Sequence, residues 1–176
     1  FNPAAVGYTV AAVSWPEQVF RYPQPYARIP LWSASDVPLS SSVSDTLRSG
    51  GMLNMSAMSL VLGEYAAPMG TGAALIIVAC GFFLWRQKDI RLSTAVSFLI
   101  TSALIVFLFP REAGLMDRSI FTTFAARLGS VRNELLTGAM LFSAVFLFNE
   151  PYTCAHHRLG RILYGALVGA AAMGFR

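Results

Sequence analysis

The sequence contains few charged residues and almost no cysteine. Charged side chains make up 12% of its 176 residues, whereas a soluble domain usually carries about 25%. Hydrophobic residues account for 55%, and the mean hydropathy is +0.56. These proportions argue against an ordinary water-soluble domain and are typical of a protein built from apolar membrane helices.

The motifs of common soluble enzymes are also missing. The chain has no G-x-S-x-G, no P-loop and no G-x-G-x-x-G, the signatures of hydrolases and nucleotide sites. Thirteen Lys and Arg against nine Asp and Glu give a formal charge of +4. These basic residues lie mostly between apolar runs, and no RNA-binding or zinc-finger pattern accompanies them. We therefore expect no nucleic-acid partner.

The two cysteines predict neither a disulfide nor a metal site. Cys80 lies in an apolar run and Cys154 in a short polar loop, so the two thiols are not expected to meet. Cys154, His156 and His157 lie within four residues. A tetrahedral site needs about four converging ligands, however, and the chain offers no second group of Cys and His.

Four apolar runs predict helices that cross a membrane, because a span needs about 20 mostly apolar residues. The runs cover approximately residues 68–85, 92–109, 135–148 and 162–175. Asn133 and Glu134 are expected to anchor the membrane interface ahead of the short third run, with a role of Glu134 in ion passage as the alternative. Residues 3–15 predict the tail of a fifth span or a half-helix. The expected fold is therefore a single all-α, polytopic integral membrane helix bundle over residues 1–176, with about four to five spans and further helices upstream.

Small residues predict close packing of the last helix. Gly165 and Gly169 form a G-x-x-x-G pair, followed by Ala172. Such residues let two helix backbones approach each other in lipid. We expect this face to contact another helix.

Residues 16–67 lack a long apolar run and are expected to form one long loop. Within them, the stretch 16–49 holds five prolines and a serine cluster. The short connections at 86–91 and 158–161 are rich in Arg and Lys. The positive-inside rule places these connections together on the cytoplasmic side, so the long loop is expected to face outward.

Several stretches resemble the RnfD/NqrB family in the same order and with similar spacing. The similar stretches are F-N-P-A-A-V-G-Y at 1–8 with V-S-W-P at 13–16, L-L-T-G-A-M-L at 135–141 with N-E-P-Y-T at 149–153, and G-R-I-L-Y-G-A at 160–166. Together they extend over nearly the whole chain. Gly7-Tyr8 and Ser14-Trp15-Pro16 are closer to RnfD than to NqrB. The chain thus resembles the C-terminal half of RnfD.

The resemblance implies a multi-pass subunit of a ferredoxin:NAD⁺ oxidoreductase in the inner (plasma) membrane. Such a complex couples electron flow to the movement of Na⁺ or H⁺, and other membrane and peripheral subunits of the Rnf type would be its partners, with the lipid bilayer around it. The subunit would relay electrons as part of the enzyme and would not be catalytic alone. In this family an outward-facing loop carries FMN, joined through its phosphate to a threonine.

This sequence departs from the family at that threonine. The matching stretch is W-S-A-S-D-V-P-L at 32–39, and it places Val37 at the flavin-bearing position. Valine has no hydroxyl and cannot form the phosphate ester. The candidates for attachment that remain are Ser33, Ser35, Ser40 and Thr46.

Several functions stay open at this point. An electron-transfer subunit would hold FMN through a serine or threonine, or without a covalent bond. A flavin-free structural or ion-conduit subunit of the same complex would explain Val37. An NqrB-like subunit of an NADH:quinone reductase shares the architecture. A solute channel rests only on the likeness of this family's bundle to that of urea transporters.

Overall fold

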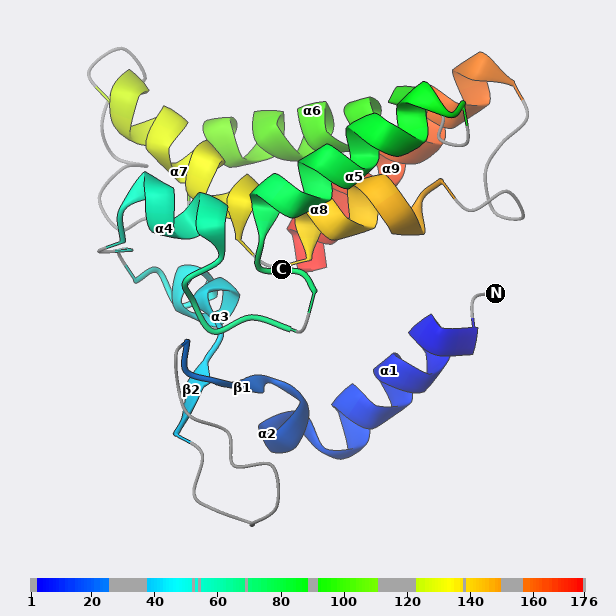
Figure 1. Ribbon diagram of the computed structural model, residues 1–176. Helices are drawn as coiled ribbons and strands as arrows, with labels where there is room; N and C mark the ends of the chain where they lie inside the picture. The colour runs from blue at the N-terminus through cyan, green and yellow to red at the C-terminus, as the bar shows by residue number, and fades with distance from the viewer. Residues whose placement is uncertain are drawn as a thin grey trace.

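The chain folds into a layer of long helices with a smaller N-terminal part beside it (Figure 1). The computed structural model describes residues 3–25, 38–51, 53, 55–68, 70–88, 92–110, 123–137, 139–149 and 157–175. In Figure 1 the N-terminal part runs from blue to cyan, and the long helices run from green to red.

The N-terminal part consists of short elements. Its helices and strands are α1 (Pro3–Ser14), α2 (Pro16–Val19), β1 (Arg21–Pro23), β2 (Leu39–Ser41), α3 (Val43–Arg48) and α4 (Ala57–Leu62). Pro16 opens α2, where its fixed φ suits the first helical position. Strands β1 and β2 pair antiparallel. Residues 16–67, expected as a single loop, therefore contain five ordered elements.

Serine side chains start the two short helices that follow β2. The Ser42 hydroxyl accepts a hydrogen bond from the Asp45 backbone N–H at the start of α3. The Ser56 hydroxyl accepts one from the Ser59 N–H at the start of α4. Gly63 ends α4 with a φ of 84°. A Cβ there would lie 2.7 Å from the Gly72 carbonyl carbon, so this tight turn requires glycine.

The helical layer follows in the second half of the chain. Its elements are α5 (Ala74–Arg86), α6 (Leu92–Leu108), α7 (Phe124–Leu136), α8 (Met140–Phe142), the π-helical turn η1 (Ser143–Leu147) and α9 (Arg158–Phe175). At Thr137 the backbone becomes extended, with φ −94° and ψ 147°. This conformation separates α7 from α8.

Helices α6 and α9 form the tightest contact in the layer. A Cβ on Gly165 would lie 2.6 Å from the Thr94 carbonyl oxygen, and one on Gly169 would lie 2.9 Å from that of Phe98. The Ser97 hydroxyl also donates to the Ile162 carbonyl at 2.7 Å. The predicted packing role of the G-x-x-x-G pair is confirmed, because no side chain fits between these backbones.

Apolar side chains from α6, α8, η1 and α9 form the core of the layer. Phe98 is 1% exposed, and its ring centroid lies 4.7 Å from that of Phe148. Polar residues of α7 are buried beside this core: Arg127, Ser130, Asn133 and Glu134. Asn133 and Glu134, expected at a membrane interface ahead of a span, lie inside α7 and are buried; their position relative to a membrane stays a prediction.

The expected bundle of membrane-spanning helices is contradicted. Nowhere in the described residues does a helix combine the length and apolar character needed to cross a membrane. The expected third span is divided between α7, α8 and η1, and α5 has 13 residues. Even α6, with 17 residues, extends about 25 Å at 1.5 Å per residue. The fold is also not all-α, because β1 and β2 form a small sheet.

The outer faces of the long helices are apolar and exposed. Large hydrophobic side chains more than half exposed lie on four helices of the layer: Leu75, Ile76, Val78, Phe82 and Phe83 of α5, Ile100 and Leu104 of α6, Phe124 and Leu128 of α7, and Leu159, Leu163, Leu167 and Phe175 of α9. Such a surface is far more apolar than that of a typical soluble monomer.

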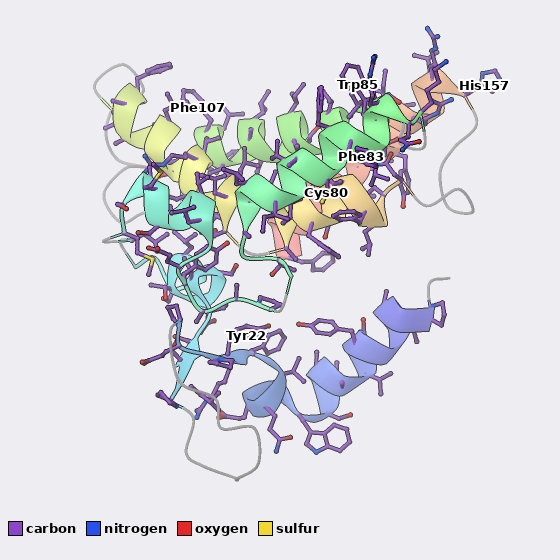
Figure 2. The ribbon with its side chains drawn as sticks, viewed as in Figure 1. Tyr22, Cys80, Phe83, Trp85, Phe107 and His157 are labelled. Carbon is purple, nitrogen blue, oxygen red and sulfur yellow. The ribbon has the colours of Figure 1, made fainter. Side chains whose placement is uncertain are left out.

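The basic connections lie at one end of the layer. Trp85, near the end of α5, and His157, just before α9, are found at the same end in Figure 2. Arg86 and Arg158 follow them directly in sequence and are exposed. This agrees with the expectation that the two connections share a side. Which side of a membrane they face stays a prediction.

Candidate cofactor site

The stretch that the resemblance links to FMN, residues 32–39, ends at the first residue of β2 in the β1–β2 ribbon. Arg21 pairs with Ser41, Tyr22 with Ser40 and Pro23 with Leu39. The Gln24 N–H donates to the Pro38 carbonyl at 3.0 Å, which extends the pairing by one step. The ribbon therefore holds both ends of the segment 26–37 together.

Three of the predicted site residues lie outside the described residues. These are Ser33, Ser35 and Val37, and nothing follows about their geometry. Cys154 and His156 also lie outside them. His157 is exposed at the start of α9. Within the described part of the chain, no group of three or more His, Cys, Asp or Glu residues could hold a metal ion.

Ser40 and Thr46 occupy different elements. Ser40 is half-buried in the centre of β2, just after the loop. Thr46 is half-buried in α3, and its hydroxyl lies 3.5 Å from the Ser42 carbonyl oxygen. The hydroxyl of Thr46 thus faces its own helix, whereas that of Ser40 belongs to the strand that closes the loop.

The two faces of the ribbon differ in chemistry. Residues directly opposite each other in an antiparallel pair share a face, and neighbours along a strand alternate. Arg21 and Ser41 therefore share one face, which borders an open cleft of about 450 Å³. Arg21 also forms an ion pair with Glu17 at 2.7 Å. Both side chains are exposed, so this pair contributes little to stability.

The opposite face carries Ser40 and Tyr22 and borders a smaller cavity, which we call the tyrosine pocket. It has a volume of about 180 Å³. Its walls come from α1, β1, α3 and the segments before α5 and α8: Tyr8, Phe20, Tyr22, Ser42, Val43, Ser44, Tyr65, Ala66, Ala67, Pro68 and Ala139. Aromatic rings thus line a cavity between the N-terminal part and the helical layer.

The hydroxyl groups of the three tyrosines have different roles. Tyr65 is 5% exposed, and its hydroxyl donates to the Leu136 carbonyl at 2.9 Å, which ties the pocket wall to α7. Tyr22 is labelled beside β1 in Figure 2. Burial, and secondarily a hydrogen bond with Tyr8, raises the pKa of the Tyr22 phenol well above its usual value. Tyr22 therefore stays protonated and neutral at physiological pH.

Sequence reasoning did not identify the tyrosine pocket. Tyr8 entered only as a letter of the motif at 1–8, and Tyr22 and Tyr65 carried no motif. These residues are distant in sequence, and only the pairing of β1 with β2 and the packing of α1 bring them together. The one available signal was the enrichment of aromatic residues around a segment expected to bind a flat ring.

Comparison with known proteins identifies the family. The chain matches the NQR2, RnfD, RnfE family over residues 1–176. It is 30% identical over 199 aligned residues to the D subunit of the ion-translocating oxidoreductase complex of Salmonella paratyphi A, an alignment that covers 96% of this chain and 53% of that protein. The protein of the same name from Salmonella typhi is 29% identical over 207 residues, with the same coverage of both chains.

The chain spans about half the length of the curated relatives that it matches. The family model covers every residue of this chain, and the similar stretches that suggested RnfD lie inside the matched region. The chain belongs to the NQR2, RnfD, RnfE family.

Proposed function

We propose that this chain is part of a membrane subunit of a redox-driven, ion-translocating oxidoreductase complex, and that it relays electrons through an FMN held beside the β1–β2 ribbon. The observation that carries the proposal is the family match over the full chain, to relatives named as the D subunit of such complexes. The chain would act within the enzyme and not as a catalyst alone.

The residues at the ribbon suit a flavin phosphate ester. The bond needs a side-chain hydroxyl, and Ser40 supplies one in β2, opposite Tyr22, which lines a pocket with aromatic walls. FMN would supply reversible one- and two-electron transfer, while the protein orients it and controls access of water. Within this proposal, Ser40 is favoured over Thr46, whose hydroxyl faces the backbone of α3.

The complex would move Na⁺ or H⁺ across the inner membrane. Its other membrane and peripheral subunits, of the Rnf type, would be the partners of this chain. The exposed apolar sides of α5, α6 and α9 support contact with such subunits and with lipid, because soluble monomers rarely leave surfaces of this kind uncovered.

Val37 favours a second candidate, a flavin-free structural or ion-conduit subunit of the same complex. Valine at the family's threonine position removes the usual hydroxyl. This alternative expects the complex to assemble fully while the subunit contains no flavin. An NqrB-like role in an NADH:quinone reductase would also be compatible with the family, which includes both types of subunit.

The deciding experiment is an ultraviolet fluorescence scan of the denatured full-length protein, followed by mass determination of peptides covering residues 29–48. A fluorescent band and an added FMN mass on Ser33, Ser35, Ser40 or Thr46 would establish covalent attachment. Ser40→Ala should abolish the band, whereas Ser41→Ala, on the other face of the ribbon, should retain it.

A dark band with unmodified peptides would rule out covalent attachment. Flavin extraction from the native complex then separates the remaining possibilities. Released FMN would indicate a non-covalent carrier, and its absence from an intact complex would favour the flavin-free subunit.

A further inference from the structure

We propose that the tyrosine pocket receives one edge of the flavin ring, and that Tyr8 and Tyr22 are the residues that bind and tune it. The inference rests on the proposed function for the presence of a flavin, and it deepens that function by naming the ring-binding residues. Neither tyrosine lies in the stretch 32–39 to which the resemblance assigns the cofactor.

The size of the pocket fits part of a flavin ring system. Its volume is about 180 Å³, and an engineered protein cavity of about 150 Å³ is known to bind benzene. One ring of the flavin therefore fits inside, while its other rings and its ribityl phosphate remain outside. Tyr22, Ser42 and Ser44 line the pocket beside apolar residues, and this mixed lining suits the pyrimidine edge of the ring system, where the hydrogen-bond acceptors of a flavin lie.

The pairing of β1 with β2 places Ser40, the favoured residue for FMN attachment, on the same face of the ribbon as the pocket. Ser40 lies directly opposite Tyr22 in the ribbon. In such pairs the two Cβ atoms are about 4.5–5.5 Å apart and point to the same face. A phosphate bound to Ser40 would start its ribityl chain on the side of the pocket. A phosphate bound to Ser41 would start on the opposite face, beside Arg21.

The chemistry of the tyrosines suits a redox ring. Tyr8 is 52% exposed and its hydroxyl is hydrogen-bonded with Tyr22, so a planar ring would lie against the exposed part of its ring. Aromatic rings prefer offset-stacked or edge-to-face contacts with each other. The Tyr22 phenol is protonated and hydrogen-bonded with Tyr8, and it would exchange that bond for one to the electron-rich reduced flavin. A donor of this kind favours the reduced state and raises the reduction potential.

The test compares three variants of the full-length protein in its complex. Tyr22→Phe removes one hydroxyl and keeps the ring. Tyr8→Leu removes a largely exposed ring. Tyr164→Phe is the matched control, because its ring lies in α9 against Phe148 and does not line the pocket. For each variant we would measure flavin content, native flavin fluorescence and the midpoint potential.

The expected results differ between the variants. Tyr22→Phe should lower the midpoint potential at unchanged flavin content, because the reduced ring loses a hydrogen-bond donor. Tyr8→Leu should raise the native flavin fluorescence severalfold, because a nearby tyrosine quenches the excited ring by electron donation. Tyr164→Phe should change neither property. A flavin-loaded complex whose potential and fluorescence are the same in all variants would overturn the inference while leaving the proposed function intact.

A wild-type complex without flavin would instead count against the proposed function. The pocket is then tested directly with lumiflavin, which has the ring system but no phosphate. Saturable quenching of lumiflavin by the wild-type complex, weakened in Tyr8→Leu and unchanged in Tyr164→Phe, would support the pocket as a ring site. Absence of saturable binding would refute it.

Discussion

The short helices of the N-terminal part and the long helices of the second half begin in different ways. Ser42 and Ser56 cap α3 and α4 with their hydroxyls, whereas Ala73 and Thr123 precede α5 and α7 without a side-chain cap. Six-residue helices are too short to be stable without such local help. The long helices are held by packing, so the two regions rely on different interactions.

The largest loss of stability is expected from a substitution in the core of the helical layer. Phe98→Ala removes a ring that is 1% exposed and packed against Phe148, and it should cost about 4 kcal/mol of stability. Phe83→Ala, at a ring that is 60% exposed, is the control and should be nearly neutral. Denaturant unfolding of the full-length protein measures both. Equal effects would mean that packing does not distinguish the two sites.

The second-largest loss of stability is expected from a substitution of the buried arginine of α7. Arg127 is 3% exposed, and it donates to the Phe107 carbonyl at 2.8 Å and to that of Leu108 at 3.2 Å. It satisfies the C-terminal carbonyls of α6. Arg127→Met should cost about 3 kcal/mol, because charged hydrogen bonds to buried carbonyls are lost. The same unfolding measurement applies, with the exposed Arg86→Met expected to be nearly neutral.

Glycine substitutions test the close approach of α9 to α6. Gly169→Ala places a Cβ 2.9 Å from the Phe98 carbonyl oxygen and should destabilise by about 2 kcal/mol through overpacking. Gly174→Ala, on the same helix, meets no atom within 4 Å and should be neutral or slightly stabilising, because alanine favours helix. Thermal unfolding compares the pair. A harmless Gly169→Ala would contradict the backbone contact.

The smallest effect is expected at the cap of α3. Ser42→Ala removes the acceptor for the Asp45 N–H and should cost about 1 kcal/mol. Ser41→Ala, one residue earlier and exposed, should cost almost nothing. Limited proteolysis would report the loss as faster cleavage near α3. Cleavage within α6 or α9 should not change, because those helices do not depend on this cap.

Sequence reasoning was most successful where local pattern and packing agree. The run at 92–109 contains α6, and the Gly165–Gly169 spacing correctly indicated a helix contact. It was wrong at 135–148, where a conformational break at Thr137 divides an apolar run that composition alone cannot subdivide. It was also wrong at 16–67, because two three-residue strands and six-residue helices are too short to produce a periodic signal.

The candidate site was predictable only in outline. The hydroxyl residues could be identified from the sequence. Only the strand pairing shows which side chain lies beside one of them, since it places Ser40 opposite Tyr22. The register of the ribbon decides which side chains share a face, and a shift by one residue would exchange them. Neither Ser40 nor Tyr22 taken alone shows that the two side chains share a face of the ribbon.

The exposed apolar sides of α5, α6 and α9 also bear on how stability should be understood. The chain exposes 11,814 Å² of surface, against about 8,400 Å² expected for a globular monomer of its mass. A component of the proposed complex that covers these helices would bind the folded chain and not the unfolded one. By mass action, the folded fraction then rises with the concentration of the covering component. Stability measured for this chain within the proposed complex would therefore be a property of the assembly, to be quoted with the amounts of the components present.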